Sequence, residues 1–185
     1  IGPAPNAGPV PVISYDPEAI KFTEEYTLTE DQIDVFYIYR DILYIPGHDP
    51  KEDWDLGNFY TKKRGGSWEK HRNIPGAIHT YALAWHNGIM FAGLGAKNRK
   101  SLVSSSDLGK TWQQHSTNLG RFYNFISVAG QLFGIGTFYP QWLKDQFPSK
   151  LVRKMAAPVF EYKEEFGFEV RDDLVWPENF FIDTK

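Results

Sequence analysis

The 185-residue sequence contains no cysteine, which excludes disulfide bonds, thiolate zinc sites and a cysteine nucleophile. No run of about 18 apolar residues is present, so no transmembrane helix is expected. The formal net charge is −3, which gives no sign of a nucleic-acid or acidic-membrane partner. Walker A and dinucleotide-binding motifs are absent, and no cofactor is expected. Aromatic residues, in contrast, make up 16% of the chain, which suits β structure or a sugar-binding surface.

One stretch combines turn-forming and strand-forming residues at a fixed spacing, Ser-x-Asp-x-Gly-x-Thr-Trp, beginning at Ser105. The carboxylate of Asp107 can accept hydrogen bonds from the N–H groups of a turn, and Gly109 can take a positive φ without steric cost. Thr111 is β-branched and favours a new strand, while Trp112 is a large anchor for packing between sheets. The stretch therefore predicts a tight turn between two strands.

This pattern resembles the Asp-box, or BNR repeat, of sialidases and related β-propellers, and the resemblance covers about residues 34–170. It implies four-stranded blades in which the box is a folding device on the outer hairpin, away from the active site. A degenerate copy, with lysine in place of the aspartate, lies 44 residues earlier, which is about the length of one blade. The residues of this copy are Thr61, Gly65, Ser67 and Trp68.

Strand and turn signals divide the chain into units. We expect an all-β protein, a β-propeller or propeller fragment with four-stranded antiparallel blades. Three complete units span about residues 34–73, 78–118 and 121–171, within a propeller domain of residues 12–185. Partial blades are expected at 12–28 and 174–185. The chain is then part of a larger propeller, or a four-bladed ring closed by its terminal strands.

The first residues of the chain, 1–11, are rich in proline and glycine and are expected to form a linker. Because the sequence begins with Ile1, we expect a processed chain or a fragment from which any signal peptide has been removed.

Strand direction alternates within a blade, so the loops between second and third strands lie at the same end as the links between units. In the propellers that this chain resembles, that end holds the ligand. The loops there combine aromatic rings, which can stack on sugars, with polar groups that can bind hydroxyls. The segment 137–158 is long enough to suggest a functional loop. The candidate ligand-binding residues are His48, Asp53, Trp54, Arg72, His79, Arg99, Arg121, Tyr139 and Trp142.

Metal binding is not predicted for this chain. The acidic loop around residue 50 is interpreted as a solvated surface, with Ca²⁺ binding as the alternative. The Ca²⁺ ligands in that alternative would be Asp49, Asp53 and Asp55. The five histidines show no ligand spacing, and His79, at the start of an inner strand, is the first choice among them for a ligand contact.

The favoured function is a non-catalytic binding or scaffold module, secreted or at the cell surface, with a glycan or a protein as ligand. A glycoside hydrolase of sialidase-like build is the alternative. However, the Arg-Ile-Pro motif of such enzymes is interrupted in the segment 72–75 by Asn73, and no Tyr/Glu nucleophile pair can be assigned by spacing. A third possibility is a structural subunit whose open blade edges are completed by a partner chain.

Overall fold

The computed structural model describes residues 9–47, 55–96, 100–117, 119–138, 158–164 and 167–175. These residues form fourteen β-strands in antiparallel sheets and no helix. The all-β prediction is confirmed. In this part of the chain there is no helix with the length and apolar character needed to cross a membrane.

The first predicted unit forms a four-stranded sheet of its own. Its strands follow one another in sequence order as β3 (Tyr37–Tyr39), β4 (Ile42–Pro46), β5 (Leu56–Lys63) and β6 (Trp68–Pro75). Arg40 and Asp41 turn the chain between β3 and β4, both at positive φ. Because β6 extends to Pro75 and β7 begins at Ala77, the link between the first two units is Gly76 alone, which has a φ of 70°.

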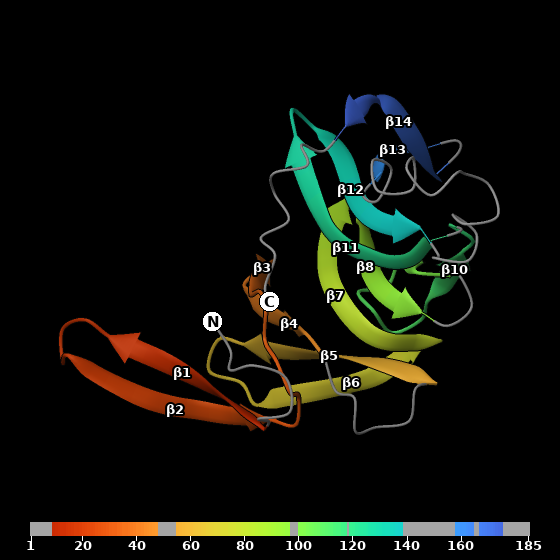
Figure 1. Ribbon diagram of the computed structural model, residues 1–185. Coiled ribbons are helices and arrows are strands. Elements are labelled where there is room, and N and C mark those ends of the chain that lie inside the picture. The colour runs from red at the N-terminus through yellow and green to blue at the C-terminus, as the bar shows by residue number, and fades with distance from the viewer. Residues whose placement is uncertain are drawn as a thin grey trace, which may run out of the picture.

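The second and third units share one sheet instead of forming separate blades. The strands of the second unit are β7 (Ala77–His86), β8 (Ile89–Ala96), β9 (Leu102–Ser105) and β10 (Gln113–His115), and those of the third are β11 (Leu119–Val128), β12 (Gln131–Phe138), β13 (Pro158–Lys163) and β14 (Gly167–Val175). β8 pairs with β11 through Gly95 and Arg121, which gives an eight-stranded sheet. This sheet curls into a half-barrel (Figure 1), and within the described residues it does not close into a ring.

A glycine explains why β8 and β11 can approach one another so closely. A Cβ atom at Gly93 would lie 2.5 Å from the carbonyl oxygen of Phe122, so any side chain there would collide with β11. A glycine within a strand is often a point where another backbone approaches closely. At Gly93 the approaching backbone is that of β11, and the pairing of β8 with β11 joins the strands of units two and three into one sheet.

The first two strands stand apart from the three units. β1 (Val10–Asp16) and β2 (Lys21–Leu28) pair only with each other among the described strands, and the hairpin projects from the rest of the molecule (Figure 1). We call β1 and β2 the arm. The predicted linker therefore ends before Val10, and Pro11 lies in β1 opposite Thr27, where an edge strand tolerates proline. At the other end of the described chain, Leu174 and Val175 complete β14 instead of starting a fourth unit; residues 176–185 lie outside the described part.

Three apolar clusters stabilise these sheets. The first lies between unit one and β7–β9, the second inside the curl of the large sheet, and the third at the base of the arm. Their largest buried side chains are Tyr44, Phe59, Leu83, Met90 and Leu94 in the first, Phe122 and Leu132 in the second, and Leu28, Ile45 and Tyr60 in the third. The apolar run 89–96 thus became β8, a strand that is mostly buried, whereas the apolar run around β3 leaves Phe36 53% and Ile38 78% exposed.

The Asp-box stretch forms the predicted turn between β9 and β10. Asp107 Oδ1 accepts hydrogen bonds from the N–H groups of Lys110 (3.1 Å) and Thr111 (2.9 Å), and Asp107 Oδ2 accepts from the Thr111 hydroxyl (2.6 Å). Gly109 has a φ of 85° and donates its N–H to the Ser105 hydroxyl at 2.8 Å. The hydrogen bonds from Thr111 hold the pKa of Asp107 well below its usual range.

The degenerate copy is also a turn, between β5 and β6, but its chemistry differs. Gly65 has a φ of 69°, and the turn is closed by a backbone hydrogen bond from Gly66 N to Lys63 O at 3.0 Å. Thr61 was aligned with the serine of the box, but the strand pairing places it one position earlier. Thr61 lies opposite Glu69, in the way that Ser104, not Ser105, lies opposite Gln113. The turn of unit one is therefore one residue shorter than the Asp-box turn of unit two. The sequences do not reveal this difference, because the glycines of the two stretches and their tryptophans are both 44 residues apart.

Candidate functional site

The first strands of units two and three carry β-bulges at equivalent positions. In β7 the register with β8 shifts between Ala77 and His79 and again between Thr80 and Ala82. In β11 the register with β12 shifts at the positions 42 residues later, between 119 and 121 and between 122 and 124. The residues in the second shift of each strand are Tyr81 and Tyr123. A bulge interrupts the regular alternation of side chains between the two faces of a strand. The side chains of both tyrosines are therefore redirected at equivalent positions of their strands.

The two bulges bring aromatic and cationic groups together. The rings of Tyr81 and Tyr123 have their centroids 5.0 Å apart. The guanidinium of Arg121 lies 5.9 Å from the centroid of the Tyr81 ring, and its Nη1 donates a hydrogen bond to the Tyr123 hydroxyl at 3.2 Å. His79 lies on the other side of Tyr81, at 5.7 Å between ring centroids. Gly95 makes room for this group, since a Cβ atom there would lie 3.1 Å from the Tyr81 ring.

Burial and charge determine the protonation of this cluster. Burial raises the pKa of Tyr81 to about 12, against the opposing effect of the Arg121 cation, while Tyr123 and Asp34 add to the increase. The hydrogen bond to Tyr123 raises the pKa of Arg121 above its usual value. At neutral pH the cluster therefore presents a permanent cation beside a neutral Tyr81 phenol that can donate a hydrogen bond.

A cavity of about 330 Å³ opens beside the two tyrosines. Its wall is formed by Asp34, Val35, Tyr37, Tyr81, Tyr123 and Asn124. One cavity is thus lined by the first strand of each unit, which is β3, β7 or β11, and by the segment before β3. We call Asp34, Tyr37, Tyr81, Arg121, Tyr123 and Asn124 the tyrosine site. It offers ring faces, a cation, a carboxylate and an amide, which are groups that bind polar ligands with apolar faces.

Of the residues named from the sequence, the structure brings two together. His79 and Arg121 pair with Gly95 from its two sides. His79 lies in β7, near the start of an inner strand as expected, while Arg121 lies in the strand β11 and not in a loop. Arg72 also lies in a strand, β6, opposite Asn58, and it is not among the residues that line the cavity. The remaining candidates, together with the possible Ca²⁺ ligands at 49 and 53, lie outside the described residues; they are His48, Asp49, Asp53, Trp54, Arg99, Tyr139 and Trp142.

The described residues contain no group of three histidine or acidic side chains that could hold a metal ion. Asp55, the third possible Ca²⁺ ligand, has its main-chain oxygen bonded to the N–H of Gly76 at 2.8 Å. The tyrosines were missed because the inner strands were interpreted as core. The signal that could have found them was the shift of 42 residues that aligns units two and three, since it relates Tyr81 to Tyr123.

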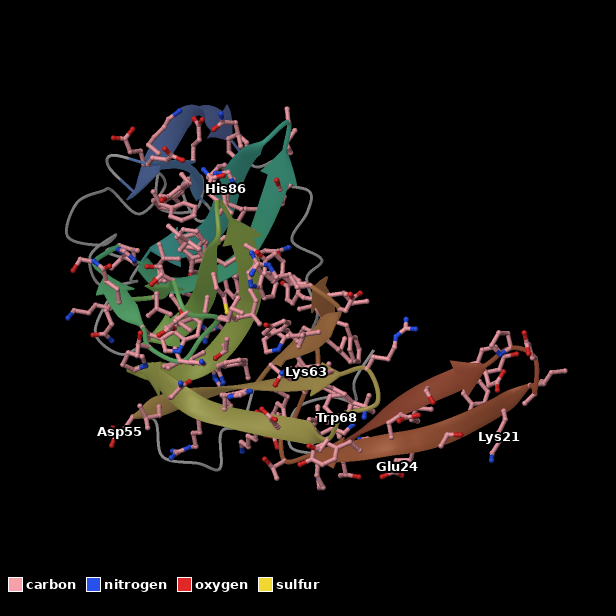
Figure 2. The ribbon with its side chains drawn as sticks, turned by 180° about the vertical axis from the view of Figure 1, so that it is seen from behind. Lys21, Glu24, Asp55, Lys63, Trp68 and His86 are labelled. Atoms are coloured by element: carbon pink, nitrogen blue, oxygen red, sulfur yellow. The ribbon has the colours of Figure 1, made fainter. Side chains whose placement is uncertain are left out.

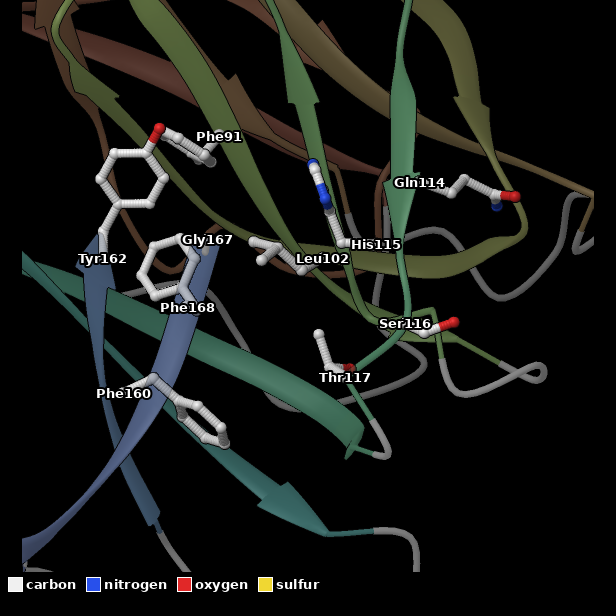
Figure 3. A pocket seen from close by; sticks show the side chains of 10 residues that line it. All are labelled: Phe91, Leu102, Gln114, His115, Ser116, Thr117, Phe160, Tyr162, Gly167 and Phe168. Atoms are coloured by element: carbon white, nitrogen blue, oxygen red, sulfur yellow. The ribbon is translucent and has the colours of Figure 1, made fainter. Parts of the chain in front are cut away.

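A second hollow, of about 410 Å³, lies between the outer strands of units two and three (Figure 3). Its floor is apolar and includes Phe91, Leu102, Phe160 and Phe168, while Gln114, His115, Ser116, Thr117 and Tyr162 supply polar atoms. The described residues that line it include no lysine, arginine, aspartate or glutamate. Burial lowers the pKa of His115, which also keeps this residue neutral at pH 7. This part of the wall therefore lacks the permanent charge that distinguishes the tyrosine site.

Comparison with known proteins gives no relative for this chain. The sequence matches no protein-family model, and a search of curated proteins finds no match.

Proposed function

We propose that this chain is part of a secreted or cell-surface β-propeller with Asp-box blades, and that it binds a glycan through the tyrosine site. The observation that carries the proposal is the pair of equivalent bulges that sets Tyr81 and Tyr123 side by side, with Arg121 bound to one and lying over the other. Aromatic rings provide flat apolar surfaces on which a sugar ring can stack. Arginine can donate several hydrogen bonds to hydroxyl or carboxylate groups.

The position of the site supports the same function. β7 and β11 begin beside the ends of β8 and β12, since Ala77 pairs with Ala96 and Leu119 with Phe138. The segments 97–99 and 139–157 continue from those two ends. Tyr81 and Tyr123 lie in the half of β7 and β11 that is nearer to those segments, which favours the end of the strands where the sequence predicted the ligand. The four-stranded sheet of unit one and the Asp107 turn support the propeller, whereas units two and three share one eight-stranded sheet in place of two separate blades.

A non-catalytic role is favoured over hydrolysis by the carboxylates of the site. A glycoside hydrolase needs two carboxyl groups about 5–10 Å apart. Among the described residues, Asp34 is the one carboxylate in the wall of the cavity. A sialidase-like hydrolase remains the alternative function, and binding of a protein surface in place of a glycan is the alternative for the ligand.

Binding to an array of neutral and carboxylated oligosaccharides, followed by calorimetry on the best ligand, tests the proposal. We expect Tyr81→Ala and Tyr123→Ala each to weaken binding at least about tenfold, because each removes a stacking surface. Arg121→Gln should weaken binding of carboxylated ligands more than neutral ones, and Arg121→Lys should retain part of it. Tyr15→Ala, at an exposed tyrosine of the arm, is the matched control. Failure of every glycan to bind, or equal affinities in all variants, would overturn the proposal, and turnover of chromogenic glycosides would support the hydrolase instead.

A further inference from the structure

The arm carries large apolar side chains that the rest of the described chain does not cover. The exposed fractions are 57% for Ile13, 52% for Tyr15 and 71% for Phe22. Tyr15 and Phe22 lie opposite each other near the tip of the hairpin, with ring centroids 4.8 Å apart. A two-stranded hairpin is marginally stable by itself in water, and only its base is held by buried residues, such as Val10 and Leu28. The exposed apolar side chains at the tip are therefore typical of a surface that packs against another protein chain.

A notch lies between the arm and the sheet of unit one. It has a volume of about 440 Å³. Its apolar residues include Ile13 of the arm and Phe36, Ile38 and Leu43 of unit one. Phe36 is 53% exposed and Ile38 is 78% exposed, so the apolar surface of the arm continues onto unit one. Contiguous exposed apolar surface of this kind marks an interaction site in soluble proteins.

The arm and the notch carry opposite charges. Between residues 16 and 25 the arm has four acidic residues, Asp16, Glu18, Glu24 and Glu25, and one basic residue, Lys21. The turn beside the notch has three consecutive basic residues, Lys62, Lys63 and Arg64, which outnumber the two acidic residues of the notch wall, Glu25 and Asp41. Figure 2 shows Lys21 and Glu24 along the arm and Lys63 on unit one.

Within the described residues these two sets of charges are not joined by ion pairs. Glu25 accepts a hydrogen bond from Ser14 at 2.7 Å, and Glu24 is bonded to Thr27. Lys62 donates to the main-chain oxygen of Gly66 at 2.7 Å. The acidic arm and the basic turn thus remain open to partners of opposite charge outside the chain.

We propose that this surface is an interface between two copies of the chain. The tip of each arm, with Tyr15 and Phe22, inserts into the notch of the other copy and places Glu24 and Glu25 near its Lys63 and Arg64. One chain holds both complementary halves, an apolar acidic arm and an apolar notch beside a basic turn. A twofold dimer satisfies both halves of both copies at once, whereas a partner of a different sequence would have to supply each half separately. This interface is independent of glycan binding.

The mass in solution, measured by light scattering or sedimentation over a concentration series, tests the dimer. We expect the wild-type protein to be dimeric and its dimer to weaken as salt is raised, because the charged contacts lie at a surface. Tyr15→Ser with Phe22→Ser should raise the dissociation constant by at least about tenfold through loss of the apolar insertion. Val128→Ser with Lys110→Glu provides the matched control, since Val128 is a 55% exposed apolar residue outside the notch and Lys110 is exposed in the Asp-box turn.

Charge reversal gives the sharper experiment. Lys63→Glu with Arg64→Glu makes the notch acidic, and Glu24→Lys with Glu25→Lys makes the arm basic, so each variant alone should be monomeric. Mixed together they should form a heterodimer, because each arm then meets a notch of opposite charge in both directions. The substituted side chains are exposed, and unchanged circular dichroism will show that the variants fold. A monomeric wild type, a dimer that persists in both variants, or a mixture that stays monomeric would each overturn the proposal.

Discussion

The outer hairpins of units one and two have the same strand geometry but different turns. In β5–β6 the Thr61 hydroxyl lies 2.8 Å from His71 Nε2, and in β9–β10 the Ser104 hydroxyl lies 2.8 Å from His115 Nε2. The turn of unit two is built around the Asp107 carboxylate. The turn of unit one has no carboxylate among its bonds and is closed by the backbone bond of Gly66 to Lys63, together with a bond from the Lys62 ammonium to Gly66 O. The two pairs of strands thus have the same pairing with either kind of turn, which indicates that the Asp-box does more than close its hairpin.

The Asp-box also makes contacts with unit one. Asn73 Nδ2 donates to Gly109 O at 2.8 Å, and Trp112 Nε1 donates to Asn73 Oδ1 at 3.3 Å. The ring of Trp112 meets the buried ring of Phe59 edge-on, with centroids 6.0 Å apart. At the turn of unit one, a Cβ atom on Gly65 would meet none of the described residues within 4 Å, and the counterpart of Trp112, Trp68, stacks on Tyr26 of the arm with ring centroids 5.4 Å apart. The complete box therefore connects unit two to unit one through its turn as well as its tryptophan, whereas the glycine of the degenerate turn is solvated.

The largest contrast between the two turns is expected for alanine at their glycines. Gly109→Ala should lower the free energy of unfolding by about 2–4 kcal/mol, since the left-handed backbone is strained for alanine and the new Cβ meets buried side chains. That Cβ would lie 2.7 Å from Phe59 Cζ. Gly65→Ala, with backbone strain alone, should cost about 1–2 kcal/mol. Urea unfolding of both variants measures the difference, and equal losses would contradict the fastening role of the box.

Removal of the Asp107 charge should have the next largest effect. Asp107→Asn replaces one acceptor oxygen with a donor and should lower the melting temperature by several degrees at pH 7. Because its pKa is lower in the folded state than in the unfolded state, Asp107 stabilises the fold above its ordinary pKa near 4 and loses this contribution as the pH falls further. The gap in melting temperature between wild type and variant should therefore narrow toward pH 3. A gap independent of pH would show that the carboxylate charge is not involved.

The two histidines should produce an acid-sensitive step that is common to both hairpins. Burial lowers the pKa of His71, against the opposing effect of Glu69, and burial also lowers the pKa of His115. Protonation then favours the unfolded chain, so stability should decrease as the pH falls below about 6.5, the unfolded value. His115→Gln and His71→Gln should each flatten the dependence of melting temperature between pH 7 and 5. His86→Gln, outside the hairpins, serves as the control, and an equal flattening in that variant would contradict the assignment.

The smallest change in stability is expected for a substitution that sequence similarity alone would predict to be stabilising. Lys63→Asp restores the missing aspartate of the degenerate copy, but residue 63 still lies in β5 and its main-chain oxygen already closes the turn. We therefore expect a change in stability within about 0.5 kcal/mol, as for other surface substitutions. A clear stabilisation in urea unfolding would mean that the shorter turn can form the box after all.

Much of the fold could be predicted, and less of the site. The hairpin turns at 40–41, 87–88 and 129–130 and the bonds of Asp107 follow from residues close together in sequence. His79 and Arg121 were named from their place at the predicted ligand end, His79 at the start of an inner strand and Arg121 in a loop. Tyr81 and Tyr123 were not named, because a regular strand alternates its side chains and a bulge breaks that alternation without a signal in the sequence.

The sequence by itself determined the class of fold, the order of strands and the chemistry of the Asp107 turn, since these depend on local backbone preferences and neighbouring hydrogen-bond partners. Only the tertiary structure decided that two units would merge through the contact of Gly93 with β11, that the two bulges would place a pair of tyrosines beside Arg121, and that the arm would expose Phe22. Each of these depends on which distant segments meet, and that choice is made by packing over the whole sheet, not by any one stretch of the chain.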